Sequence, residues 1–167
     1  MKPLFRITLT ALVLSALNAC ATWGGAALQP GLPEQEVITH LGKPTHVYQD
    51  GNSRMLEYMH GPMGQTTEMA RIGPDGKLVS YEQVLTMQHF AKLKLNESRE
   101  SDVLRTVGAP SETRFYSRIG LISWNYPYKE SGVWDSEMSV YFDGQGIVRR
   151  LENGPDPRRM PSDGGRN

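Results

Sequence analysis

Residues able to carry acid–base or metal chemistry are scattered along this chain. No His-Glu-x-x-His pair and no Gly-x-Ser-x-Gly turn occurs, and these are the spacings that place metal ligands or a nucleophile together. A carboxylate pair could still act in catalysis, but the carboxylates between residues 46 and 72 are more simply solvent-facing strand and loop residues. We therefore predict no enzyme, no metal and no cofactor. The residues considered are His40, His46, His60, His89, Asp50, Glu57 and Glu68.

The single cysteine, Cys20, follows a segment with the layout of an export signal. Residues 1–19 begin with Lys2 and Arg6 and continue with an apolar run of 11 residues, 7–17. As a helix that run rises only about 16 Å, roughly half of a hydrocarbon core. We therefore expect a signal peptide and not a permanent transmembrane span.

The stretch Leu17-Asn18-Ala19-Cys20 resembles the bacterial lipobox. The resemblance implies that the Cys20 thiol takes a diacylglycerol and that the mature chain begins there. Each buried CH₂ contributes about 0.8 kcal/mol, so two or three acyl chains hold a protein on a membrane. An Asp after the cysteine would resemble the signal that retains such lipoproteins at the inner membrane. Ala21 stands there, so the resemblance points to the outer membrane. The alternative is ordinary secretion, with cleavage between small residues.

The charge balance argues against a nucleic-acid partner. Removing residues 1–19 takes away two basic residues and no acidic one, so 18 − 2 = 16 basic residues remain against 18 acidic ones. A duplex-binding protein normally has a strong basic excess. Residues 20–29 read as a lipidated tether, and residues 154–167, rich in Pro, Gly and charge, are expected to be disordered.

One short element occurs twice, as VITHLGKPT at 37–45 and VLRTVGAPS at 103–111, a spacing of 66 residues. Each copy predicts a short helix with one apolar stripe. Such helices are unstable alone in water, so each stripe must pack on another element. The stripes consist of Val37, Ile38 and Leu41, and of Val103, Leu104 and Val107.

Each predicted helix is followed by the sequence Gly-x-Pro. Gly42 and Gly108 are expected to end the helices in a left-handed cap, and Pro44 and Pro110 prevent the helices from resuming. These four residues mark the two repeats.

The segments that follow predict antiparallel strands. Residues 55–59 and 121–126 alternate as half-buried strands do, and a 66-residue register aligns Tyr58 with Trp124. Gly-rich hairpin turns then follow at an offset of 70, which places four extra residues in KESGVWDS. We predict an α+β fold of two tandem repeats, 30–88 and 89–153, each a short helix or helix pair on a three-stranded sheet.

The aromatic residues divide into core and surface candidates. Those on the predicted strands are expected to face the helices: Leu56, Tyr58, Ile122, Trp124 and Tyr126. Trp134 and Tyr128 lie in or beside the extra residues, amid polar neighbours. Since exposed aromatics are favoured interface anchors, both are predicted to contact a partner.

The phrase LQPGLPEQEVITHLGKPT, residues 28–45, resembles the SmpA/OmlA family of BamE-like outer-membrane lipoproteins. The resemblance covers residues 28–85, with Pro33 where the family has a Ser or Thr helix cap. The second copy is weaker, with Glu97 in place of the family's glycine. The tandem arrangement is similar to the two-lobed β-lactamase inhibitor protein. The resemblance implies a helix-on-sheet fold used for binding.

These observations together predict a lipoprotein anchored in the outer membrane and facing the periplasm. Its expected role is a non-catalytic, protein-binding adaptor in outer-membrane protein assembly or envelope integrity, with β-barrel assembly components among the expected partners. One alternative is an inhibitor-like binder of a periplasmic enzyme, and a third is a small periplasmic enzyme.

Overall fold

The computed structural model describes residues 28–60 and 65–160, which form two four-stranded antiparallel sheets with the strands in sequence order. The first repeat contains α2 (Glu34–Leu41), β1 (His46–Asp50), β2 (Ser53–His60), β3 (Thr66–Ile72) and β4 (Leu78–Gln83). The second contains α3 (Met87–Phe90), α4 (Glu100–Val107), β5 (Glu112–Tyr116), β6 (Leu121–Glu130), β7 (Trp134–Phe142) and β8 (Val148–Pro155). We call β1–β4 sheet 1 and β5–β8 sheet 2.

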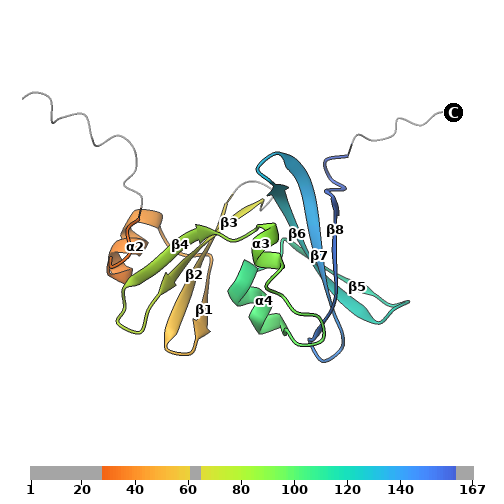
Figure 1. Cartoon of the computed structure of the whole chain (residues 1–167), viewed down its shortest axis with the longest axis horizontal. Helices are drawn as coiled ribbons and strands as arrows, with labels where there is room; N and C mark the ends of the chain where they lie inside the picture. Colours follow the sequence, from red (N-terminus) through yellow and green to blue (C-terminus); the bar gives the residue numbers. More distant parts are fainter. Residues whose placement is uncertain (1–27, 61–64, 161–167) are drawn as a thin grey trace, which may run out of the picture.

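The elements stack in alternating layers. From left to right, Figure 1 shows α2, sheet 1, the pair α3 and α4, and sheet 2. The α+β class is confirmed, but the expectation of three strands per sheet is wrong. The missed strands, β1 and β5, lie at sheet edges with mostly exposed side chains. Such strands need no alternating apolar pattern, because backbone pairing to the neighbouring strand holds them.

The 66-residue register holds through the first strand of each sheet, where His46 corresponds to Glu112, but not beyond it. His46 pairs with Glu57 and Glu112 pairs with Asn125, so Glu57 corresponds to Asn125 at an offset of 68. The turn between the paired strands is residues 51–52 in the first repeat and 117–120 in the second. Two of the four extra residues therefore lie in that turn, not around Trp134, and Tyr58 corresponds to Tyr126.

Each repeat has its own apolar core between helix and sheet. Val37 of α2 is fully buried against β2–β4, and Val103 and Val107 of α4 are fully buried against sheet 2. Burying such a side chain contributes about 1.5 to 3 kcal/mol. Among the expected core residues, Leu56, Tyr58 and Tyr126 are buried, Trp124 packs partly buried against the second core, and Ile122 is partly buried.

The helices end at the predicted glycines. Gly42 has φ 84° and ψ −170°, Gly108 has φ 84° and ψ −168°, and each N–H bonds to the carbonyl four residues earlier. This extended backbone with positive φ is open essentially to glycine alone. It differs from the left-handed helical cap that the sequence predicts, but the helix boundaries are confirmed.

The C-terminal segment is ordered further than predicted. Pro155 ends β8 and pairs with Ser136, and the side chain of Asp156 is fully buried. The Arg158 guanidinium donates two hydrogen bonds of 3.0 Å to the Asp156 carboxylate. The prediction of disorder from residue 154 is therefore wrong up to residue 160, and residues 161–167 lie outside the described part.

Candidate functional site

Sheet 1 has a second face, opposite α2, that meets the second repeat. Met55, Met69 and Val84 form a small buried cluster on this face. Helix α4 lies between the two sheets, as Figure 1 shows. One side of α4 packs on sheet 2, while Arg105 and neighbouring polar residues turn toward sheet 1. The two repeats thus share α4.

The carboxylate of Glu57 connects the two repeats. We call Glu57 and its partners Ala109, Tyr48 and His46 the joint. The Glu57 side chain is fully buried, and its Oε1 accepts the Ala109 backbone N–H at 3.0 Å. Oε2 accepts the Tyr48 hydroxyl at 2.5 Å and lies 3.0 Å from His46 Nδ1. Burial first, and then the Glu57 carboxylate, raise the pKa of Tyr48, which keeps the phenol a hydrogen-bond donor.

The expectation that Glu57 faces solvent is therefore wrong. Its neighbours Leu56 and Tyr58 point to the α2 side, and alternation along β2 places Glu57 on the opposite face. On that face Glu57 is covered by the segment around Ala109, which lies 52 positions further along the chain. Asp50 and Glu68 remain partly exposed, with side-chain exposures of 38% and 26%.

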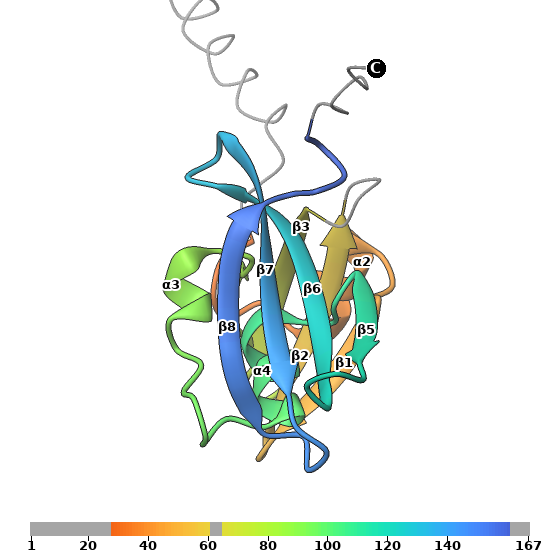
Figure 2. The same ribbon diagram turned by 90° about the vertical axis from the view of Figure 1, so that its right-hand side faces the viewer.

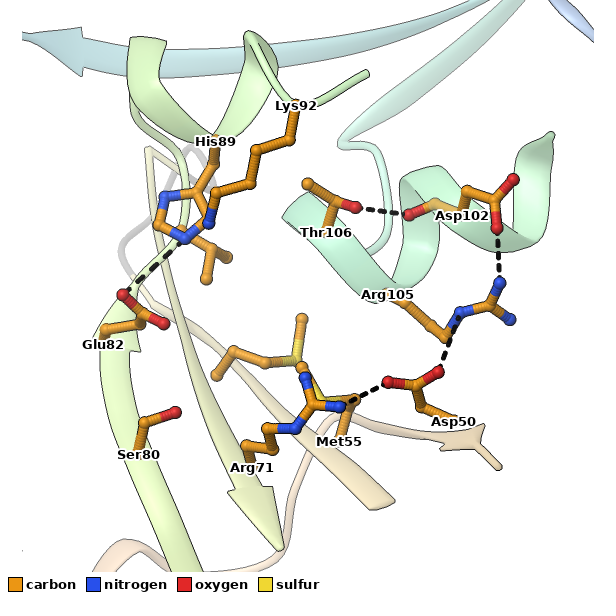
Figure 3. Close-up of a pocket in the computed structure, with 12 residues that line it drawn as sticks. Asp50, Met55, Arg71, Ser80, Glu82, His89, Lys92, Asp102, Arg105 and Thr106 are labelled. Carbon is orange, nitrogen blue, oxygen red and sulfur yellow. Dashed lines mark hydrogen bonds and ion pairs between the residues drawn. The ribbon is translucent and has the colours of Figure 1, made fainter. Parts of the chain in front are cut away.

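Beside the joint, a cavity of about 290 Å³ opens between sheet 1 and the helices α3 and α4. Figure 3 shows its labelled side chains pointing inward from both sides. The apolar floor is the cluster of Met55, Met69 and Val84. The polar lining residues are Asp50, Arg71, Ser80, Glu82, His89, Lys92, Asp102, Arg105 and Thr106.

A chain of ion pairs forms one wall of the cavity. Asp50 lies 2.6 Å from Arg71 Nη2 and 3.8 Å from Arg105 Nε, and Arg105 Nη2 is 2.5 Å from Asp102. These contacts tie β1 and β3 to α4. Each charge has a partner of opposite sign, so the wall is nearly neutral.

The opposite wall contains His89 and Lys92. Burial first, and then the nearby Lys92 ammonium, lower the pKa of His89, which favours the neutral imidazole, while the Glu82 carboxylate opposes this. Its Nε2 lies 3.7 Å from Glu82, and its Nδ1 lies 2.9 Å from the Thr86 hydroxyl. Thr86 caps α3 by accepting the His89 backbone N–H. The cavity thus presents both charged and apolar side chains to a small molecule or side chain that enters it.

The histidines serve separate local contacts. His46 belongs to the joint, His60 Nε2 lies 2.8 Å from Glu68, His89 lines the cavity and His40 is exposed on α2. Among residues 28–60 and 65–160, no group of three His, Cys, Asp or Glu side chains is placed to hold a metal ion.

The two predicted contact residues lie in different environments. Trp134, the first residue of β7, is 70% exposed, and Val133 before it is 65% exposed. Tyr128 is fully buried, with its ring 5.4 Å from that of Phe90 and its hydroxyl donating to Asn153 Oδ1 at 3.0 Å. Burial raises the pKa of Tyr128 to about 12. Tyr128 is therefore a core residue, and its predicted surface role is wrong.

The alternation of β6 could have revealed this, since Tyr128 follows the buried Tyr126 by two residues. The partner contact of Trp134 stays a prediction, and Cys20 lies outside the described residues.

Comparison with protein-family models, curated proteins and solved structures finds no match. No helix in the described ranges is long and apolar enough to span a membrane.

Proposed function

We propose that this chain is a lipoprotein of the outer membrane, facing the periplasm, that acts as a non-catalytic, protein-binding adaptor. Its field of action is outer-membrane protein assembly or envelope integrity. The lipobox at Cys20 supports the location. The observation that carries the binding role is the pair Val133 and Trp134, both highly exposed at the β6–β7 hairpin. Exposed aromatic side chains are favoured as interface anchors.

Contacts around the hairpin fix the backbone at Trp134. Trp134 pairs with Glu130 across the strands, and Lys129 Nζ lies 2.8 Å from Asp135. Gln65, from the first repeat, donates to Asp135 Oδ1 at 2.7 Å. A backbone that is already fixed at the anchor loses less conformational entropy on binding, which favours affinity.

The substitution Trp134→Ala tests the contact. We expect the melting temperature to stay within about 2 °C and the recovery of partners to fall severalfold, because a central anchor commonly contributes about 2 kcal/mol or more. The measurement is a pull-down from detergent-solubilised envelopes alongside thermal melting. Trp124→Ala is the matched control, since Trp124 packs 4.6 Å from the Phe142 ring and should instead cost about 3 to 5 kcal/mol of stability.

The recovered proteins decide between the functions. Recovery of β-barrel assembly components would support the adaptor function. Recovery of one soluble enzyme in a fixed ratio to this chain would instead support the alternative function, an inhibitor-like binder of that enzyme. Unchanged recovery with Trp134→Ala would remove this side chain from the interface.

The substitution Cys20→Ser tests the location. We expect the variant to leave the membrane fraction, because the acyl chains on this thiol are the proposed anchor. Palmitate labelling of the wild type, with and without globomycin, gives the measurement. Wild-type protein that takes up no label and fractionates as soluble would contradict the lipid anchor.

A further inference from the structure

Two charges in the cavity between the repeats lack a charged partner. One wall is the chain of ion pairs described above, whose members balance one another. On the opposite wall, Lys92 forms no ion pair with any residue of 28–60 or 65–160. In the same ranges the Glu82 carboxylate has only the His89 ring, at 3.7 Å. One positive and one negative charge are therefore left for a ligand.

The His89 ring cancels neither of these charges. Burial first, and then the Lys92 ammonium, lower its pKa, and the Glu82 carboxylate opposes them. The favoured neutral ring leaves the negative charge of Glu82 uncompensated. Because Lys92 and Glu82 both act on this one ring, they lie within the span of a small ligand. Figure 3 shows the Lys92 side chain beside His89, with Glu82 below the ring.

Both charged groups are accessible to solvent. Figure 2 shows α3 beside the β8 edge of sheet 2, not beneath the sheet. Lys92, which follows α3, is exposed, and the Glu82 side chain is 55% exposed. A solute therefore meets both groups at the mouth of the cavity.

The strand register places an apolar floor next to these charges. Glu82 of β4 pairs with Met69 of β3, and Met69 packs with Met55 and Val84. These three apolar side chains are each at most 8% exposed. An apolar group that enters beside Glu82 therefore lies against two methionines, whose flexible side chains adapt to its shape.

Volume and charge together define the class of ligand. The cavity measures about 290 Å³, just below the range of about 300 to 1,000 Å³ that suits drug-sized ligands. It therefore fits a smaller molecule. Glu82 would repel a simple anion, and Lys92 would repel a simple cation. A small zwitterion with an apolar tail matches both charges and the floor.

We propose that this cavity binds a free α-amino acid with an apolar side chain. The carboxylate of the ligand pairs with the Lys92 ammonium, and its ammonium group pairs with the Glu82 carboxylate. Its side chain lies on Met55, Met69 and Val84. This site goes beyond the proposed adaptor function and does not rest on it.

Isothermal titration calorimetry on the full chain tests the site, with L-leucine and L-methionine as probes. We expect saturable binding of both. Three analogues each lack one part of the ligand: glycine lacks the side chain, N-acetyl-L-leucine lacks the ammonium group and L-leucinamide lacks the carboxylate. Each should bind about tenfold more weakly than L-leucine or worse, because each loses either apolar burial or a charged contact.

Two variants assign each charge of the ligand to its partner. Lys92→Gln should weaken L-leucine binding about tenfold without weakening L-leucinamide, which has no carboxylate to lose. Glu82→Gln should weaken L-leucine equally without weakening N-acetyl-L-leucine. Lys94→Gln is the matched control, since Lys94 lies two residues beyond Lys92 and pairs with the exposed Glu97 outside the cavity. It should bind L-leucine like the parent chain.

The melting temperature of each variant should stay within about 2 °C of the parent, since the replaced groups are exposed. No saturable binding of L-leucine or L-methionine at millimolar concentration overturns the proposal. Analogues that bind as tightly as L-leucine overturn it too, as do Lys92→Gln and Glu82→Gln variants that bind like the parent chain. None of these outcomes bears on the adaptor function, which the pull-down tests separately.

Discussion

Gly108→Val is expected to lower the free energy of unfolding by about 3 kcal/mol or more. Two costs combine in this substitution. The backbone of Gly108 has φ 84°, which a β-branched residue adopts only under strain. In addition, the new Cβ would approach Glu57 Oε1 to 2.5 Å, so the buried carboxylate must move away from its donors. Urea denaturation measures the loss.

Gly42→Val separates the two costs. Gly42 has the same φ, but the space around it is open. We expect this variant to lose only about 1 to 2 kcal/mol, the cost of backbone strain alone. Equal losses at the two glycines would mean that Gly108 is not crowded against Glu57.

Glu57→Ala should cost about 3 to 5 kcal/mol. The substitution leaves the Tyr48 hydroxyl and the Ala109 N–H without their acceptor, and each such buried group costs about 1 to 3 kcal/mol. The space vacated by the side chain adds a cavity term. Glu68→Ala is the matched control, because Glu68 is partly exposed and, within the described part of the chain, forms an ion pair only with His60, so less than about 1 kcal/mol is expected.

Two probes show whether the joint couples the repeats. With Trp23 replaced by Phe, the remaining tryptophans, Trp124 and Trp134, both lie in the second repeat, so their fluorescence reports its unfolding, whereas far-ultraviolet circular dichroism reports both repeats. The two transitions should coincide in the wild type and separate in Glu57→Ala. A loss below about 1 kcal/mol with coincident transitions would show that the carboxylate does not join the repeats.

The helices and the repeat could be predicted because their signals are local. Gly42 and Gly108 combine the end of an apolar stripe with a backbone that essentially only glycine adopts. Strands β1 and β5 could not be recognised in this way, since their side chains are mostly exposed and their partners hold them through the backbone. The turn between the first two strands is two residues longer in the second repeat than in the first. This difference shifts the register of the later strands and alters neither helix.

The joint and the cavity could not be predicted from a single sequence. Glu57 alternates with Leu56 and Tyr58 as a solvent-facing residue would. Its side chain is buried because Ala109, distant in the sequence, packs against it in the folded chain. The cavity likewise combines residues from six elements or their flanks, from Asp50 to Thr106. The exposure of Trp134 could be predicted, because polar neighbours in a turn are a local signal.

Sharing α4 between two sheets imposes an order on biogenesis. A chain delivered from its N-terminus presents β1–β4 before α4 is available, so Met55, Met69 and Glu57 stay uncovered until residues 100–109 have followed. The first repeat therefore cannot complete its structure as an independent early unit. A chain broken off after β4 would expose these apolar and carboxylate groups together, which makes it a natural substrate for chaperones and proteases.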